Sequence, residues 1–225
     1  MALARFKDLC IDAADPDVLG PFWAAVLGRT YERREDGGLL LGPTPGHTIW
    51  LNAVPDDKTV KHRVHLDIYS RQLGELEQLG ASVLDREAGG GRWAVMADPE
   101  GGEFCAFLRA ELPDERLHGL VVDSRDPFRS ARWWADVYGA ELVEHVNEGY
   151  ATVQQIPGMP IETFDFVPVP EPKAVKNRIH WDVIVPALDP LLERGATVVL
   201  AEGDDRGWHV LADPEGNEFC AFVRP

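Results

Sequence analysis

The chain has 225 residues, a length that allows one or two domains, and 45% of them are hydrophobic, which is enough to bury a core. Its 22 basic and 38 acidic side chains give a formal net charge of −16, which argues against nucleic acids and membrane surfaces as partners because polyanions are bound by basic residues. No segment approaches the roughly 18 consecutive apolar residues of a membrane span, and three cysteines without an apolar leader predict reduced thiols in the cytoplasm.

The first half of the chain predicts two successive units of one strand, one helix and further strands. A strand over residues 6–12 precedes a helix in which Asp15 is the cap, Pro16 takes the first turn and Gly28 ends the last. Asp98-Pro99-Glu100-Gly101 predicts a hairpin turn. Further strands are predicted over 39–41, 48–54, 64–69, 82–84, 93–97 and 103–108, with a short helix over 72–79.

The second half repeats the first. Residues 98–107 and 213–222 share nine of ten residues at an offset of 115, and the same offset aligns 61–67 with 176–182. Nearer the start, the offset becomes 111. The repeating unit is half of the chain, which is the size of a domain rather than of a solenoid repeat. We therefore predict two domains, residues 1–110 and 116–225, packed against each other as a pseudo-dimer.

A polar strand face is predicted at Lys61-x-Arg63-x-His65-x-Asp67, because strand side chains alternate between faces. His65 could bind a ligand, a metal or a transferable proton. Alternatively, Arg63 and Asp67 could form an ion-pair ladder with charges on neighbouring strands, such as Glu103, and His65 would be hydrogen-bonded between them. Cys105 would share that face, as a nucleophile or as a small buried residue. Among the tryptophans, Trp23 and Trp134 are expected in the core, Trp181 against a helix, and Trp50 either at a ligand or in the core.

These duplicated motifs carry a family resemblance. They are D-x-x-D-P, W-A-x-V-x-G, V-P-x-x-K-x-V-K-x-R followed by H-x-D, G-A-x-V, and D-P-E-G-x-E-F-C-A-F. Over essentially its whole length the chain resembles the vicinal oxygen chelate superfamily, which includes glyoxalase I, extradiol dioxygenases and bleomycin resistance proteins. The resemblance implies an α+β fold of tandem domains, each built from two βαβββ modules that form a cupped half-barrel.

The resemblance also implies where a metal would bind. The sequence departs from the family pattern, because Cys105 and Cys220 replace the usual glutamate. Two alternatives are compatible with this departure: each domain binds one divalent ion, which would be zinc because the ligands are soft, or neither domain binds a metal. The candidate metal ligands are His65, Cys105 and Asp8 in one set, and His180, Cys220 and Asp165 in the other. His65 and His180 are also the candidate catalytic residues. The candidate ligand-binding residues are Trp50, Arg63, Asp67, Glu103, Cys105, Asp165, Arg178, Asp182, Glu218 and Cys220.

Two functions remain open from the sequence. The first is a binding protein of the bleomycin-resistance type that sequesters a small cationic or aromatic molecule in each cup. The second is a metal-dependent lyase, isomerase or dioxygenase that uses His65 and His180. A homodimer of the whole chain is compatible with both.

Overall fold

The computed structural model describes residues 2–203 and 206–224, and it folds as four consecutive βαβββ modules in an α+β architecture. No helix in these residues is long and apolar enough to cross a membrane. The first module consists of β1 (Arg5–Ala13), α1 (Pro16–Leu27), β2 (Thr30–Arg34), β3 (Gly37–Leu41), a 3-10 turn (Pro45–His47) and β4 (Ile49–Ala53). The second consists of β5 (Val64–Ser70), α2 (Leu73–Gln78), β6 (Ser82–Asp85), α3 (Ala88–Gly91), β7 (Ala94–Ala97) and β8 (Glu103–Leu108).

The second half of the chain forms the other two modules. The third consists of β9 (Leu117–Ser124), α4 (Pro127–Tyr138), β10 (Glu141–His145), β11 (Tyr150–Gln154) and β12 (Thr163–Pro168). The fourth consists of β13 (Ile179–Val185), α5 (Asp189–Leu192), β14 (Thr197–Leu200), β15 (His209–Ala212) and β16 (Glu218–Val223). The strands predicted from alternation in the first half are all present, whereas β2 was missed.

The long helices begin and end as their sequences predict. The Asp15 carboxylate accepts a hydrogen bond from the backbone N–H of Asp17, and Gly28 ends α1 in the left-handed region at φ 68°. In α4 the same positions are taken by Asp126 and by Gly139 at φ 59°. The duplicated Asp-Pro and Gly are therefore helix boundaries rather than parts of a binding site.

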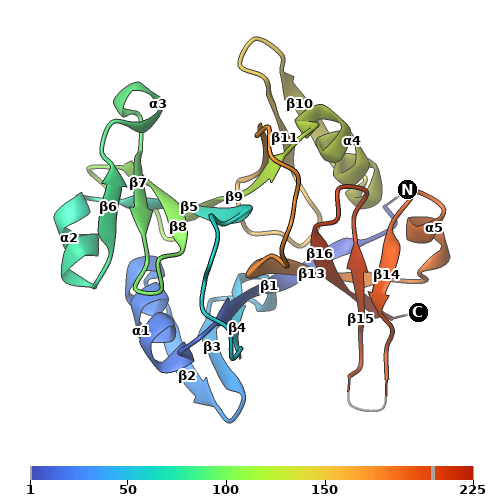
Figure 1. Ribbon diagram of the computed structural model, residues 1–225, viewed down its shortest axis with the longest axis horizontal. Coiled ribbons are helices and arrows are strands. Elements are labelled where there is room, and N and C mark those ends of the chain that lie inside the picture. Colours follow the sequence, from blue (N-terminus) through green and yellow to red (C-terminus); the bar gives the residue numbers. More distant parts are fainter. Residues whose placement is uncertain (1, 204–205, 225) are drawn as a thin grey trace.

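Each of the two sheets combines strands from both sequence repeats. Within the described residues, one eight-stranded sheet has the order β14-β15-β16-β13-β1-β4-β3-β2 and the other has the order β10-β11-β12-β9-β5-β8-β7-β6. Strand β1 pairs antiparallel with β13, and β5 pairs antiparallel with β9 (Figure 1). Each sheet thus joins a module of the first half to a module of the second. The repeats define what is duplicated in the sequence, and the strand pairing defines the sheets.

The core lies between the sheets and the helices and joins modules of the same half. Trp23 on α1 packs edge-on against Phe104 of β8, with ring centroids 5.2 Å apart. Trp134 on α4 makes the equivalent contact with Phe219 of β16 at 5.0 Å and also meets Trp181 at 5.0 Å. All three tryptophans are at most 1% exposed, as predicted for core positions. Because the cores join modules within a half and the sheets join modules across the halves, the four modules depend on one another.

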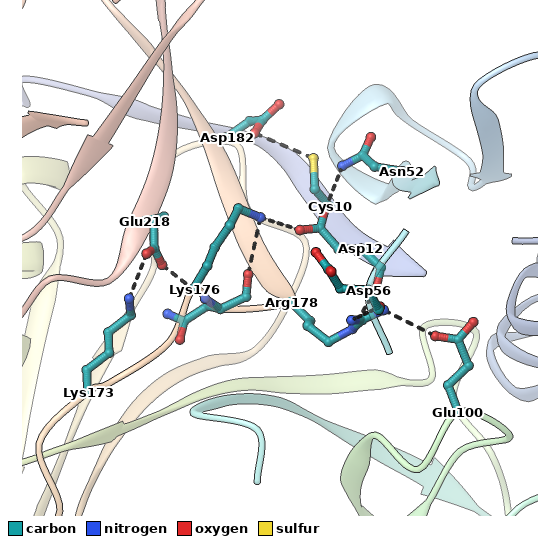
Figure 2. Close-up of polar contacts among 11 residues, drawn as sticks. Cys10, Asp12, Asn52, Asp56, Glu100, Lys173, Lys176, Arg178, Asp182 and Glu218 are labelled. Carbon is teal, nitrogen blue, oxygen red and sulfur yellow. Dashed lines mark hydrogen bonds and ion pairs between the residues drawn. The ribbon is translucent and has the colours of Figure 1, made fainter. Parts of the chain in front are cut away.

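The linkers between modules, residues 54–63 and 169–178, fasten the two halves together. Lys176 forms an ion pair with the buried Asp12 of the first half, and Lys61 does the same with Asp123 of the second (Figure 2 shows Asp12). The Arg178 guanidinium donates to the carbonyl of Asp56 at 2.7 Å. The duplicated K-x-x-K-x-R motif is therefore an inter-half clamp.

The sequence had predicted that Lys61 and Arg63 lie on the polar face of a strand, and this is wrong. Strand β5 begins only at Val64, and Arg63 donates to the carbonyl of Glu171 in the opposite linker at 2.8 Å. The predicted ladder between Arg63 and Glu103 is also absent from the described contacts, because Lys58 pairs with Glu103 at 2.8 Å. The chain passes from one sheet to the other at this point, and the local periodicity of the sequence carries no information on that passage.

The D-P-E-G turn does more than close a hairpin. The Glu100 carboxylate accepts hydrogen bonds from the backbone N–H groups of Ala14 and Asp15, at 2.9 and 2.7 Å, just before α1. In the second half, Glu215 accepts from Arg125 and Asp126 at 3.0 and 2.9 Å. Each turn thus connects one module to the helix start of its neighbour within the same half.

Candidate functional site

Each sheet presents one face to the helices and one polar face, because side chains alternate along its strands. Two groups of side chains gather on the polar faces where modules from different halves meet. Site A comprises Lys7, Asp8, Cys10, Trp50, His180, Asp182 and Cys220, from strands β1, β4, β13 and β16. Site B comprises His65, Asp67, Cys105, Gly119, Thr152 and Asp165, from strands β5, β8, β9, β11 and β12.

A lysine lies among the carboxylates of site A. The pairing of β1 with β13 shifts register between Phe6 and Asp8, and this bulge turns Lys7 onto the polar face. Its Nζ lies 2.7 Å from Asp8 and 3.4 Å from Asp182. Burial, and secondly Asp8, raise the pKa of Asp182 to about 7, while Lys7 acts in the opposite direction. Site A therefore contains its own cation.

Aromatic rings flank that ammonium group. Lys7 Nζ lies 4.3 Å from the ring centroid of Phe222 and 6.0 Å from that of Trp50, within cation–π range. The Trp50 indole N–H donates to Asp8 at 3.0 Å, and the residue is 39% exposed. Trp50 is therefore not a core residue, and it lies at the site, as one of the two predicted alternatives had it.

The remaining polar atoms of site A are buried. Cys10, His180 and Asp182 have ligating atoms within 4.8 Å of one another, and Cys10 Sγ lies 3.6 Å from Asp182. Burial lowers the pKa of His180 to about 4, so the ring is neutral at pH 7, and its Nδ1 has no hydrogen-bond partner within the described residues. Burial, reinforced by Asp182, raises the pKa of the Cys10 and Cys220 thiols well above their usual range. Both thiols are thus protonated and poor nucleophiles.

In site B the first half of the chain supplies a histidine, an aspartate and a cysteine at the positions equivalent to those of site A. His65 Nε2 lies 3.5 Å from Asp67 Oδ1, and Cys105 lies within 4.8 Å of both ligating atoms. Burial lowers the pKa of His65 to about 4 and raises that of the Cys105 thiol far above its usual range. Burial, and then the nearby Asp165, raise the pKa of Asp67 to about 8. The Cys–His pair is therefore a neutral imidazole beside a neutral thiol.

A second carboxylate reaches site B across a glycine. Gly119 on β9 pairs with Asp67 on one side and with Thr163 on the other. A Cβ at Gly119 would lie 2.8 Å from Thr163 Oγ1 and 3.3 Å from Asp67 Cβ, so a side chain there would crowd both neighbours. Asp165 accepts a hydrogen bond from the Thr152 hydroxyl at 2.5 Å, and burial raises its pKa. Asp165 Oδ2 lies 3.8 Å from the same Cβ position, so the absence of a side chain at Gly119 lets the two carboxyl groups approach each other.

Aromatic side chains surround site B. The His118 ring lies tilted against that of Tyr69, with centroids 4.7 Å apart, and a hydrogen bond of 2.8 Å joins His118 Nδ1 to the Tyr69 hydroxyl. Phe107 lies 5.4 Å from the same ring and stacks on Trp93 at 5.6 Å. The Tyr150 ring stacks on the imidazole of His145, with centroids 4.1 Å apart. These rings give the polar face apolar walls.

Four of the residues predicted to bind a ligand lie away from both sites. Arg63 and Arg178 belong to the linkers, as described above. Glu103 pairs with Lys58 at 2.8 Å, and Glu218 pairs with Lys173 at 2.6 Å, so both hold the linkers to strand ends (Figure 2 shows the second pair).

The predicted metal-ligand sets were wrong in their carboxylates. Asp8, predicted with His65 and Cys105, lies with Asp182 in site A, and Asp165, predicted with His180 and Cys220, lies beside Asp67 in site B. The two exchange places because the strands that carry them pair across the halves of the chain.

Sequence reasoning missed several members of the sites. Cys10 has no cysteine at the equivalent position of the second half, where Val121 stands, so the repeat gave no signal for it. Thr152 and the aromatic residues Tyr69, Phe107 and Tyr150 lie on strands whose partners were not predictable. Their alternation with buried residues was the one available signal, and it indicated a face but not what that face meets.

Solved structures with this fold exist. Glyoxalase I from Zea mays superposes with a TM-score of 0.69 at 15% identity, covering 98% of this chain and 92% of that one. A protein from Bacillus subtilis described provisionally as a dioxygenase superposes with a TM-score of 0.65 at 14% identity, covering 100% of this chain and 86% of that one. At these identities the likeness shows the fold alone. No curated protein sequence is similar enough to count as a match.

The family model of the glyoxalase-like domain matches twice, over residues 8–107 and 119–222. The two matches cover almost all of the described chain and coincide with the internal repeat. The chain therefore belongs to the glyoxalase-like domain family, within the vicinal oxygen chelate superfamily, and carries two tandem copies of that domain.

Proposed function

We propose that this protein binds a small organic molecule with cationic or aromatic character on the polar faces of its sheets. The observation that carries the proposal is the composition of site B, in which two carboxyl groups, the buried Asp67 and the half-buried Asp165, lie among aromatic rings. Aromatic walls with a few placed polar groups are typical of small-molecule sites. The net charge of −16 adds attraction for cations, although it is spread over both repeats.

The proposal keeps residues 1–110 and 116–225 as the two duplicated domains, with one site at each place where their modules meet. Sequestration, as in proteins of the bleomycin-resistance type, requires binding and no chemistry at the ligand. The three cysteines are unbonded, which suits the reducing environment of a cytoplasm. A homodimer of the whole chain is compatible with these sites and is not needed to complete them.

Thermal unfolding tests the binding proposal. The full chain is freed of metal with a chelator, and its melting temperature is measured with a panel of aromatic amines, aromatic acids and neutral aromatic compounds. A bound compound stabilises the native state, so at least one class should raise Tm by more than about 1 °C. The rise should shrink in Trp93→Leu, which removes a wall of site B. A panel without any shift would refute the proposal.

Metal-dependent chemistry is the second candidate, and it is favoured by the cluster of His65, Asp67 and Cys105. An imidazole nitrogen, a carboxylate oxygen and a sulfur within 4.8 Å of one another suit zinc, which in catalytic sites takes three protein ligands and keeps one position open. A zinc ion there would supply a Lewis acid for a lyase, isomerase or dioxygenase reaction. His65 would then be a ligand and not a proton donor.

Site A does not fit a divalent metal in the same way. The Lys7 ammonium already lies between Asp8 and Asp182, and a second cation would have to displace it against charge repulsion. His180 therefore has no catalytic role in this candidate. Equilibrium dialysis with Zn²⁺ distinguishes the candidates: about one retained ion per chain, lost in Cys105→Ser and unaffected by Cys10→Ser, supports metal binding at site B.

A further inference from the structure

Sites A and B occupy equivalent places in the two sheets, but they differ in one charge. By the repeat offsets, Asp182 of site A corresponds to Asp67 of site B, and Phe222 corresponds to Phe107. The position of Lys7 is taken by His118, which turns to Tyr69 and Glu162 instead, at 2.8 and 3.0 Å. Site B thus keeps the acidic and aromatic partners of an ammonium group and lacks the ammonium.

The second carboxylate of each site comes from a different strand. In site A it is Asp8 on β1, whose equivalent is Gly119. In site B it is Asp165 on β12, whose equivalent on β4 is Trp50. Two carboxylates are therefore present in both sites although the repeat does not duplicate the second one.

The carboxylates of site B have no lysine or arginine paired with them in residues 2–203 and 206–224. Their titratable neighbours are imidazoles and a thiol: His65 Nε2 lies 3.5 Å from Asp67, Cys105 lies beside both of these residues, and His118 and His145 act on Asp165. Asp67 is 8% exposed, and its Oδ1 has no hydrogen-bond partner. A buried carboxyl oxygen without a hydrogen-bond partner is costly to the fold, and the raised pKa of Asp67 reflects burial without a cation. An ammonium group beside Asp67 and Asp165 would donate to this oxygen and lower that pKa, so that Asp67 would be ionised in the complex.

We infer that site B binds the primary ammonium group of a small aromatic amine between Asp67 and Asp165, in the position that Lys7 takes in site A. The inference rests on the proposed function and names the chemical class of its ligand. By the repeat offset Phe107 takes the place of Phe222, whose ring centroid lies 4.3 Å from the Lys7 nitrogen. Trp93, stacked on Phe107, and Tyr150 then contact the aromatic body of the ligand. Lys7 makes site A self-occupied, so the chain takes up one amine.

Calorimetric titration with benzylamine, in metal-free buffer, tests this inference. Benzyl alcohol has nearly the same size and shape without the charge, and it serves as the matched ligand. Full-length protein should bind about one equivalent of benzylamine, and benzyl alcohol at least about tenfold more weakly, because a hydrogen bond to an ionised partner contributes more than a neutral one. Asp67→Asn, which preserves shape, should weaken benzylamine by about tenfold or more and leave benzyl alcohol within about twofold. Glu32→Gln, which changes an exposed carboxylate on β2 of the other sheet, is the control and should change neither.

Lys7 supplies a second, opposite test. Lys7→Met empties site A of its cation and leaves Asp8 and Asp182 together, so the variant should bind about two equivalents of benzylamine. If it does not fold, Asp67→Asn and the benzyl alcohol comparison still decide the question. Equal affinity for benzylamine and benzyl alcohol would overturn the amine inference while leaving small-molecule binding intact. Absence of binding by both ligands, with retention of Zn²⁺, would overturn the inference and favour the metal-dependent candidate.

Discussion

Removing the Lys176 ammonium should destabilise the protein far more than its exposed position suggests. Lys176 pairs with Asp12, whose side chain is 8% exposed (Figure 2). Within the part of the chain that the structure describes, the one other side chain that donates to this carboxylate is the Asn52 amide, at 3.2 Å. The lysine itself is 57% exposed. The pair joins the two halves of the chain, so its loss also weakens the contact between linker and β1.

The magnitude follows from this asymmetry of burial. Lys176→Met leaves a carboxylate buried without its cation, and breaking a fully buried pair in this way costs about 3–5 kcal/mol. Water can approach the half-exposed nitrogen and reduces that figure, so we expect a loss of about 2 kcal/mol in the free energy of unfolding. Asp12→Asn returns the lysine to water and should cost about 1 kcal/mol. The double variant should lose less than the sum, with a coupling of at least about 1 kcal/mol.

Urea denaturation of the four proteins, followed by tryptophan fluorescence, gives the required double-mutant cycle. The ion pair between Arg33 and Asp17, 2.8 Å long with side chains 76% and 48% exposed, provides the control, and Arg33→Met should cost less than about 0.5 kcal/mol. Equal losses for Lys176→Met and Arg33→Met, or a coupling near zero, would refute the reasoning. A difference in the slope of unfolding with urea would instead show that the variant no longer unfolds in one step.

Three further predictions concern the connections between modules. A protease site inserted between Ala110 and Glu115 should allow cleavage into two halves that still elute together in native size exclusion, because β1 pairs with β13 and β5 with β9; separation of the halves would contradict the sheet topology. Glu100→Ala removes two backbone hydrogen bonds at the start of α1 and should lower the free energy of unfolding by about 2 kcal/mol. Glu100→Gln retains one acceptor oxygen, so it should lose about half as much stability as Glu100→Ala. Burial lowers the pKa of His62 to about 4, below the 6.5 of an unfolded histidine, so the unfolded state binds more protons between these values and stability falls as the pH falls through them. Replacing His62 and Gly102 by asparagines, as in the second half, should therefore reduce the stability lost between pH 7 and pH 5 by up to about 2 kcal/mol, and an unchanged pH profile by chemical denaturation would contradict this origin.

The surroundings of His62 show that the two halves fill the same volume with different side chains. In the second half, the Asn177 amide donates to Asn217 at 3.1 Å. In the first half, a Cβ added at Gly102 would lie 2.7 Å from the His62 ring, so the imidazole takes the volume of the missing side chain. The changes at the two positions compensate each other, and neither is understandable from one position alone.

Local chemistry made much of the fold predictable. Asp15 and Gly28 specify the ends of α1 because their side-chain and backbone preferences act within a few residues. Alternation predicted that Trp181 packs on the helix face while His180 lies on the polar face, and both do. These features depend on contacts between neighbours in the sequence, and a repeat at a fixed offset doubles the evidence for each.

The candidate sites depended on information of another kind. The duplicated His65 and His180 were found, but Asp67 meets Asp165, and Asp8 meets Asp182, only because strands from opposite halves pair. Arg63 was misplaced because the chain passes from one sheet to the other before β5 begins, and there Arg63 contacts the opposite linker.

The sequence by itself determined that the protein is a duplicated α+β domain of the glyoxalase-like family, because helix caps, turns and strand alternation act locally and occur twice. The tertiary structure decided which modules share a sheet, and with that which carboxylates meet and which of them already hold a cation. A lysine in a one-residue bulge of β1 separates a self-neutralised site from one that lacks a cation, and the position of that bulge follows from strand pairing between residues about 175 positions apart.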